Sequence, residues 1–253
     1  ETSSRCNNKC KDCAASMGLR EQGDMSTCTF NKCIGKLMRE EFEEAGLFLL
    51  GNPLLNKNIY KMVAMVVSAA MRPFITINID DLCPDVVIRL CDAGIKSVKI
   101  SVSKCKLFKP SAIWSAGYCV ARGVDFSASM IIKHKTTVFN FYKHHYRENL
   151  IDLYPLPLHN CAGVIDNGGK GCPGTWDNPA PLTPCYPLFR GFYVDWKGRN
   201  TLCPICHDEK FLNGSLLEHS ALELWHSEFA QDLRNQHLTG NITHPSCRKC
   251  LGL

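Results

Sequence analysis

Three cysteines near the start of the chain, Cys6, Cys10 and Cys13, lie close enough in sequence to hold one inorganic centre. Thiolate sulfur selects zinc or iron-sulfur clusters rather than hard cations. Three ligands leave one coordination position open, which is typical of catalytic rather than structural metal sites. The spacing alone leaves two alternatives: an iron-sulfur cluster, or a zinc site completed by a fourth Cys or His from elsewhere in the chain.

A second group of cysteines lies near the C-terminus and contains Cys185, Cys203, Cys206, Cys247 and Cys250. Two pairs in this group have two residues between their thiols, which is the spacing of a four-thiolate zinc ribbon. A zinc ribbon is therefore one interpretation of this segment, and a second iron-sulfur cluster is the other.

The chain has 16 cysteines among 253 residues. A chain of this length can bury a large core without disulfides, and its first residues lack the charged and apolar regions of a secretory signal. We therefore expect reduced thiols and a cytoplasmic protein. Because the sequence opens at Glu1 rather than Met, we also expect a trimmed start, with a first strand leading into Ser4 missing.

The formal charge is +5 and 45% of the residues are hydrophobic. No run of Lys and Arg alternates with aromatic residues, so nothing indicates a nucleic-acid partner. The longest apolar stretches are too short to span a membrane. These features predict a globular protein with neither a nucleic-acid nor a membrane partner.

Short apolar runs alternate with helical patterns through most of the chain, as is typical of βαβ units and a parallel sheet. The expected helices span 30–44, 59–70, 84–93 and 112–122, and the expected strands span 47–50, 74–79, 97–102 and 125–133. Such units predict an α/β partial barrel with its chemistry at the carboxyl ends of the strands. Farther along, the sequence predicts a hairpin at 192–202 and one helix at 220–238.

The cysteine spacing and the motifs that follow it resemble the radical S-adenosylmethionine superfamily. That family has a partial (β/α)6 barrel, and three cysteines at its first strand-to-helix turn hold a [4Fe-4S] cluster whose fourth iron binds S-adenosylmethionine. The resemblance implies that Cys6, Cys10 and Cys13 hold this cluster here. It departs from the family pattern at Asp12, where an aromatic residue usually precedes the third cysteine.

Further motifs follow in the order of that family. Residues 50–55, Leu-Gly-Asn-Pro-Leu-Leu, resemble the turn that meets the amino group of S-adenosylmethionine, and 76–78 and 93–101 resemble the next two strand ends. The resemblance implies cofactor contacts from Gly51, Asn52, Pro53, Asn78, Ser101 and Ser103. Asn52 replaces the usual Glu, so it offers an amide oxygen to an ammonium group but no charge.

The C-terminal segment resembles the shortened SPASM module called a twitch domain, a β-hairpin and helix that hold an auxiliary [4Fe-4S] cluster. The resemblance implies ligands from Cys185, Cys203, Cys247 and Cys250, with Cys206 as the alternative that could displace one of them. It also implies a barrel at 1–160, a connector rich in Gly, Pro and Asn at 161–184, and the cysteine-rich domain at 185–253.

The resemblance implies an enzyme that generates a 5′-deoxyadenosyl radical and abstracts a hydrogen atom from its substrate. An auxiliary cluster with four protein ligands accepts electrons, which implies a two-electron oxidation of a small polar metabolite. Cys161 stands where a dehydrogenase of this family presents a pocket arginine, and a flavodoxin- or ferredoxin-type donor would supply electrons. The alternatives are a peptide-modifying maturase of the same family and a non-enzymatic zinc protein.

Overall fold

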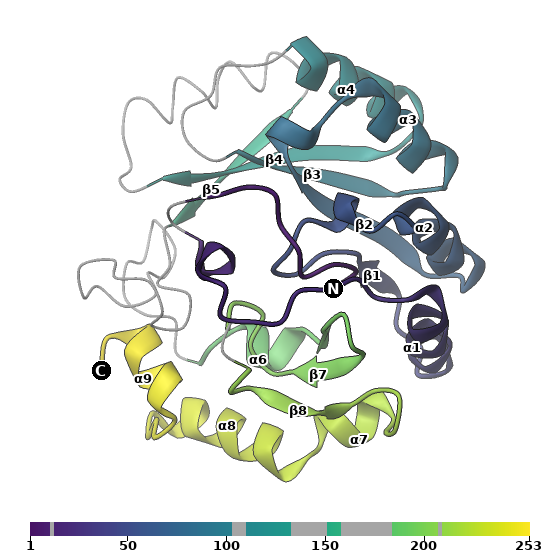
Figure 1. Ribbon diagram of the computed structural model, residues 1–253. Helices are drawn as coiled ribbons and strands as arrows, with labels where there is room; N and C mark the ends of the chain where they lie inside the picture. The colour runs from purple at the N-terminus through teal and green to yellow at the C-terminus, as the bar shows by residue number, and fades with distance from the viewer. Residues whose placement is uncertain (11–12, 103–109, 133–150, 158–183, 207–208) are drawn as a thin grey trace.

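A parallel sheet of five strands, in the order β1-β2-β3-β4-β5, forms the centre of the N-terminal part (Figure 1). The strands are β1 Glu44–Gly46, β2 Arg72–Asn78, β3 Ser97–Val102, β4 Asp125–Ile132 and β5 Asp152–Pro157. This computed structural model describes residues 1–10, 13–102, 110–132, 151–157, 184–206 and 209–253. Each strand is parallel to the next one in the chain, which is the arrangement that repeated βα units produce.

Four helices cover one face of the sheet (Figure 1); the first precedes β1, and the other three connect successive strands from β1 to β4. They are α1 Thr27–Arg39, α2 Ile59–Ser68, α3 Pro84–Asp92 and α4 Pro110–Ala121. Three short 3-10 helices, η1 Ala14–Met17, η2 Pro53–Leu55 and η3 Ile79–Asp81, lie in the turns. The four helices bury apolar side chains against the sheet, in one continuous core.

The two faces of the sheet differ in chemistry because successive residues of a strand point to opposite sides. Ile75, Ile77, Val98 and Ile100 are buried in the helix-covered core. The alternate residues of the inner strands are mostly polar, and they face the opposite side of the sheet: Thr76, Asn78, Lys99, Ser101, Ser127 and Ser129. The expected α/β partial barrel is therefore confirmed, with a polar inner face.

The C-terminal part contains a separate antiparallel sheet, in the order β6-β7-β8. Its strands are β6 Tyr193–Val194, β7 Arg199–Thr201 and β8 Leu212–Ser215. Its helices are α6 Pro187–Arg190, α7 Ala221–Trp225, α8 Glu228–Thr239 and α9 Pro245–Leu251. The expected hairpin is present as β6 and β7, and β8 adds a third strand that the sequence did not predict.

Three predicted elements were wrong in detail. The helix expected at 30–44 is α1, which ends at Arg39, and the backbone of Glu41 just beyond it is left-handed with a φ of 61°. The strand expected at 47–50 is β1, which ends at Gly46, because the N-terminal segment takes the next backbone groups: Thr2 Oγ1 donates to the Leu47 carbonyl, and Leu50 N–H donates to the Glu1 carboxylate. The single helix expected at 220–238 is broken into α7 and α8. The Ser227 side chain accepts the Ala230 N–H and starts a new helix there.

Helix α1 joins the two parts of the molecule. The Glu40 carboxylate accepts hydrogen bonds from the backbone N–H groups of Ala221 (2.9 Å) and Leu222 (2.7 Å), at the start of α7. Phe42 and Phe192 pack edge to face with ring centroids 5.8 Å apart. The N-terminal segment lies between the parallel sheet and the C-terminal part (Figure 1), so both contribute to its position.

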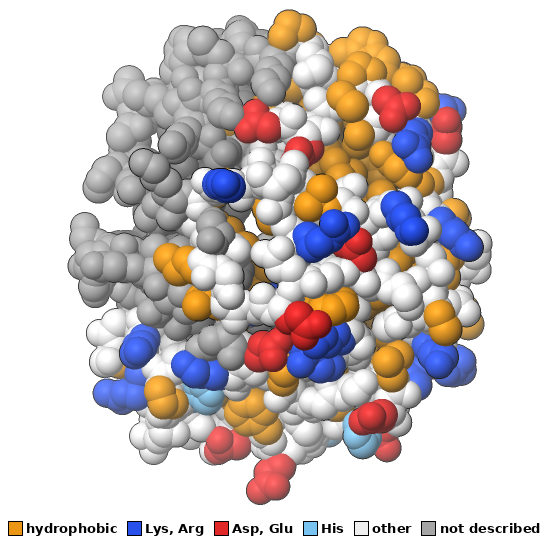
Figure 2. Space-filling model, viewed as in Figure 1, with side chains coloured by type: hydrophobic (Ala, Val, Ile, Leu, Met, Phe, Trp, Pro, Cys, Tyr) orange, Lys and Arg blue, Asp and Glu red, His pale blue; other side chains and the backbone are white. Residues whose placement is uncertain are grey.

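Basic and acidic side chains are interspersed on the face drawn in Figure 2, with no continuous basic surface there. Within the described ranges, every helix is too short or too polar to cross a lipid bilayer.

Candidate metal centres and cofactor site

The loop that carries the first three cysteines lies at the carboxyl ends of β1 and β2. Its two asparagines reach a single acidic residue that follows β2: Asn7 Nδ2 is 3.3 Å from Asp81 Oδ1, and Asn8 Nδ2 is 3.1 Å from Asp81 Oδ2. Cys6, Cys10 and Cys13 are all half-buried. The fold therefore brings the three thiols to the edge of the sheet where parallel α/β proteins place their chemistry.

Contacts on the N-terminal side fix the start of this loop. Ser3 pairs with Asp24 in an antiparallel bridge, and the Arg5 guanidinium forms an ion pair with the Asp24 carboxylate. The same guanidinium donates to the Leu55 carbonyl at 2.8 Å. Arg5 is thus held immediately before Cys6, which limits where the first thiol can lie.

Gly51 allows the N-terminal segment to pass close to the turn after β1. A Cβ atom at this position would lie 2.2 Å from the Ser3 carbonyl oxygen and 2.8 Å from the Arg5 carbonyl oxygen, distances at which no side chain fits. The structure thus gives Gly51 a packing role beside the cysteine loop. Pro53 follows in the first turn of η2 and is buried.

Asn52 is 4% exposed, and both ends of its amide make hydrogen bonds. Its Oδ1 accepts the Leu54 N–H at 3.1 Å and caps η2, while its Nδ2 donates to Asn7 Oδ1 at 2.7 Å and to Asp81 Oδ2 at 3.0 Å. The amide oxygen expected to meet an ammonium group therefore already accepts one hydrogen bond and has one lone pair left. The carboxylate nearest to this position comes from Asp81.

Sequence reasoning missed Asp81. Its carboxylate accepts three amide hydrogen bonds, from Asn7, Asn8 and Asn52, and no Lys or Arg of the described residues forms an ion pair with it. A carboxylate has about four lone-pair positions, so one remains for a cationic ligand. The available signal was an acidic pair, Asp80-Asp81, directly after an expected strand.

Two of the remaining predicted site residues, Asn78 and Ser101, lie on the sheet. Asn78 ends β2, its Oδ1 accepts the Asp80 N–H at 2.9 Å, and it is in register with Ser101 on β3. Lys99, on the same inner face, places Nζ 5.9 Å from the centroid of the Tyr154 ring, and the sequence analysis had not singled it out. Ser103 and Cys161 lie outside the described residues.

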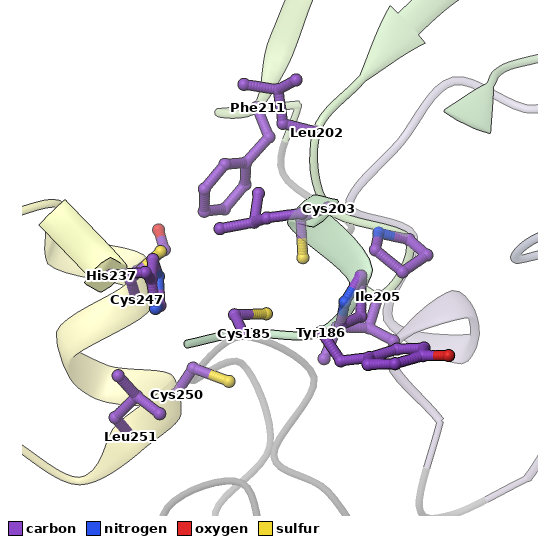
Figure 3. A pocket seen from close by; sticks show the side chains of 14 residues that line it. Cys185, Tyr186, Leu202, Cys203, Ile205, Phe211, His237, Cys247, Cys250 and Leu251 are labelled. Atoms are coloured by element: carbon purple, nitrogen blue, oxygen red, sulfur yellow. The ribbon is translucent and has the colours of Figure 1, made fainter. Parts of the chain in front are cut away.

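The second cysteine group surrounds a cavity of about 130 Å³ in the C-terminal part (Figure 3). Cys185 precedes α6, Cys203 follows β7, and Cys247 and Cys250 lie three residues apart on α9, on one side of that helix. The sulfur atoms of Cys185, Cys203 and Cys250 point into the same space in Figure 3. Four thiols that are distant in sequence therefore line one cavity.

Burial makes these thiols hard to ionise in the absence of a metal. It raises the pKa of Cys203 well above its usual value, with the neighbouring Cys206 and Cys185 adding to the effect. It also raises the pKa of Cys247 to about 12, again with Cys185 and Cys206 contributing. Thiols in such surroundings become thiolates only when a metal centre compensates their charge, so loading this cavity releases protons.

Comparison with known proteins decides the nature of the C-terminal part. Residues 185–251 match the family model of SPASM, described as an iron-sulfur cluster-binding domain. The C-terminal part is a SPASM domain. The matched residues, 185–251, contain all four cysteines that line the cavity. The matched family is described as binding an iron-sulfur cluster, which argues against the zinc ribbon.

Solved structures resemble the chain beyond the SPASM domain. BtrN in complex with AdoMet and 2-DOIA is 19% identical with a TM-score of 0.66, and the alignment covers 95% of this chain and 86% of BtrN. Native anSMEcpe with bound AdoMet is 12% identical with a TM-score of 0.68, covering 98% of this chain and 84% of that one. SuiB of Streptococcus suis bound to S-adenosylmethionine is 11% identical with a TM-score of 0.54, and the alignment covers 92% of this chain and 66% of SuiB.

These likenesses establish the fold, a parallel α/β partial barrel followed by a small C-terminal domain. A search of curated protein sequences finds no match.

In the part of the chain that the structure describes, no group of three or more His, Cys, Asp or Glu side chains is arranged to hold a metal ion, and this applies to both cysteine groups.

The two alternative ligands of the SPASM domain, Cys203 and Cys206, lie in one buried cluster with Cys185 and Cys247. Cys203 is among the residues that line the cavity and Cys206 is not, although Cys206 is close enough to contribute to the raised pKa of Cys203 and Cys247. His237 also lines the cavity, and sequence reasoning missed it, because nothing in the spacing of α8 distinguishes a histidine at a cavity from one in a core. Burial lowers the pKa of His237, and the nearby His244 lowers it further.

Proposed function

We propose that the chain is a radical S-adenosylmethionine enzyme in which Cys6, Cys10 and Cys13 hold a [4Fe-4S] cluster. One observation carries this proposal: the three-cysteine loop is tied to the carboxyl ends of β1 and β2, within a fold shared with proteins solved with AdoMet. When bound and reduced, this cluster supplies the electron that cleaves S-adenosylmethionine to methionine and a 5′-deoxyadenosyl radical.

The residues around the loop fit such a cosubstrate. S-adenosylmethionine carries an ammonium group, and the Asp81 carboxylate beside the cysteine loop is the anionic group that can accept from it. Asn52 orients that carboxylate through its 3.0 Å hydrogen bond. Gly51, Pro53, Asn78, Ser101 and Ser103 complete the proposed cofactor pocket, as the family resemblance implies.

We propose that Cys185, Cys203, Cys247 and Cys250 hold an auxiliary [4Fe-4S] cluster in the SPASM domain. Their shared position around one cavity supports this assignment, and the placement of Cys206 outside the lining supports Cys203 over Cys206. With four protein ligands, no iron would be open to substrate, so this cluster would carry electrons.

The proposed reaction is a two-electron oxidation of a small polar metabolite. In this oxidation a substrate C–H bond would give its hydrogen atom to the 5′-deoxyadenosyl radical, which would become 5′-deoxyadenosine. The substrate would then lose one proton and one electron, and an auxiliary cluster held by Cys185, Cys203, Cys247 and Cys250 would supply an acceptor for that electron. The polar inner face of the barrel supports a polar substrate, and Lys99 on that face is placed to contact it.

Within this class, the chain resembles 2-deoxy-scyllo-inosamine dehydrogenase, a twitch enzyme that oxidises an aminocyclitol alcohol. The solved BtrN complex contains 2-DOIA and covers nearly the whole chain, which supports the comparison. Cys161 replaces the pocket arginine of that enzyme, so we propose a related rather than identical alcohol. A flavodoxin- or ferredoxin-type protein is the proposed source of electrons.

A peptide substrate is the second candidate. The structure of anSMEcpe with bound AdoMet and Cp18Cys peptide resembles this chain with a TM-score of 0.65 at 13% identity. Incubating the reduced enzyme with S-adenosylmethionine and either aminocyclitols or short Cys- and Ser-containing peptides separates the two candidates. Stoichiometric 5′-deoxyadenosine with a product two hydrogens lighter, in one set only, identifies the class.

The test of the proposal as a whole is anaerobic reconstitution. We expect a brown protein with absorbance near about 400 nm, about eight irons and labile sulfide, that forms 5′-deoxyadenosine when dithionite and S-adenosylmethionine are added. A colourless zinc protein without labile sulfide would refute it.

A further inference from the structure

His237 is a buried histidine with no hydrogen-bond partner among the described residues. It lies on α8, is 3% exposed, and neither of its ring nitrogens meets a donor or acceptor in that part of the chain. It is also one of the residues that line the cysteine cavity, and Figure 3 shows it beside Cys247 at the edge of that space.

An imidazole always carries at least one N–H donor, and leaving a buried donor unsatisfied costs free energy. Buried polar groups in native proteins nearly always have partners, so an exception calls for an explanation such as an absent ion or ligand. The cavity is otherwise lined by the four thiols and chiefly by apolar side chains such as Leu202, Phe211 and Leu251. The hydroxyl-bearing Ser246 and Tyr186 also line it, and neither forms a hydrogen bond with His237. The partner that His237 lacks therefore belongs to whatever fills the cavity.

Its neighbour His244 is in a different situation. The His244 ring stacks on Phe211 with ring centroids 4.4 Å apart, and it is not among the cavity-lining residues. His237 is buried and His244 is half-buried, and of the two it is His237 that borders the space between the thiols.

We propose that His237 donates an N–H hydrogen bond to a sulfur atom of the auxiliary cluster and thereby raises the reduction potential of that cluster. This inference rests on the proposed auxiliary [4Fe-4S] cluster. A reduced cluster carries one more negative charge than an oxidised one, so a hydrogen bond to its sulfur stabilises the reduced form more. His237 would thus make the auxiliary centre a better acceptor for the electron left on the substrate.

The test measures the auxiliary cluster alone, in the full chain with Cys6, Cys10 and Cys13 all changed to Ala. The midpoint potential of this parent protein is compared with that of His237→Phe, which removes the donor, and His237→Gln, which retains an N–H group. The matched control is His226→Phe, an exposed histidine at the end of α7 in the same domain.

We expect His237→Phe to lower the ratio of reduced to oxidised cluster about tenfold at a fixed potential, which is a shift of about 59 mV for one electron. His237→Gln should recover part of this shift, and His226→Phe should not change the potential. An unchanged potential in His237→Phe, with about four irons retained, overturns the inference but leaves the proposed function intact.

A second measurement covers the case in which His237→Phe fails to fold or to take up iron. Electron-nuclear double resonance on the reduced parent, labelled with ¹⁵N-histidine, should show a weak nitrogen coupling and an exchangeable proton. A strong coupling of the kind produced by a direct iron–nitrogen bond, or no coupling, overturns the inference. A parent protein that binds no iron in the SPASM domain would instead refute the proposed auxiliary cluster.

Discussion

The side-chain nitrogen of Asn52 lies 3.0 Å from Oδ2 of Asp81, and this contact links the turn after β1 to the end of β2. A Glu at position 52 could not donate this hydrogen bond and would place a second carboxylate against Asp81. Asn52 and Asp81 therefore form a consistent pair, in which the neutral side chain orients the charged one. We infer that the negative charge of the cofactor pocket has moved from the first position to the second.

This pairing predicts that Asp81→Asn weakens binding of S-adenosylmethionine at least about tenfold, which corresponds to about 1.4 kcal/mol, because it removes the only carboxylate contributed by this pair. Isothermal titration of the reconstituted protein measures the affinity. The neighbouring Asp80→Asn, on the same short helix η3, serves as the matched control and should bind normally. Equal affinities for Asp81→Asn and the unaltered protein would contradict the prediction.

If Cys6, Cys10 and Cys13 hold the first cluster, Cys10→Ala should remove that cluster and the activity that depends on it. Loss of one of three thiolates should abolish 5′-deoxyadenosine formation and reduce the iron content from about eight to about four per chain. Cys28 is an exposed cysteine on α1, and Cys28→Ala is the control: it should retain both 5′-deoxyadenosine formation and the full iron content. Retention of 5′-deoxyadenosine formation by Cys10→Ala would argue against the cluster assignment.

The SPASM domain predicts opposite results for its two neighbouring cysteines. Cys206→Ala should keep about eight irons, because Cys206 does not line the cavity, whereas Cys203→Ala should lose about four. Iron and sulfide analysis of both variants decides the ligand. The assignment is wrong if the two variants exchange these results.

Gly51→Ala tests the close passage of the N-terminal segment. The added Cβ would clash with the backbone of residues 3–5, so we expect the free energy of unfolding to fall by about 1–3 kcal/mol and cluster loading to be poor. Gly117→Ala is the control: it lies inside α4 with open space around its Cβ position, and we expect a stabilisation of up to about 1 kcal/mol. Thermal unfolding compares the two, and an unchanged melting temperature for Gly51→Ala would count against the clash.

Two buried cysteines that lie outside both proposed metal sites should make the stability of the protein fall at alkaline pH. Burial raises the pKa of Cys33 to about 11 and that of Cys119 to about 12. A raised pKa means that the unfolded chain loses these protons first, so their contribution to stability is complete below about pH 9 and falls as the pH rises toward 11–12.

Alkylation measures the same property. At pH 8, iodoacetamide should modify the exposed Cys28 and Cys83 long before Cys33 and Cys119, as followed by mass spectrometry of peptides. Comparable rates for the buried and exposed thiols would show that the core around α1 and α4 opens readily.

Much of the fold was predictable because it depends on local patterns. The helices α2 and α3 and the strand β3 followed from apolar periodicity and from the Gly and Pro residues at their ends, and β3 was predicted with the bounds that it has. The break between α7 and α8 was not predicted, because the periodicity of apolar residues continues across the capping residue Ser227. The end of β1 was misplaced because Glu1 and Thr2 take its hydrogen bonds from far away in sequence.

The sequence by itself determined the two cysteine groups, their spacing and the βα alternation that carries them, since each of these is a relation between residues close together in the chain. Only the tertiary structure decided which groups face those cysteines. Asp81 meets the cysteine loop across 73 residues of chain, and His237 reaches a cavity whose thiols begin at Cys185. Hydrogen-bond partners and burial at such separations are set by how the elements pack, and packing leaves no periodic signal in the sequence.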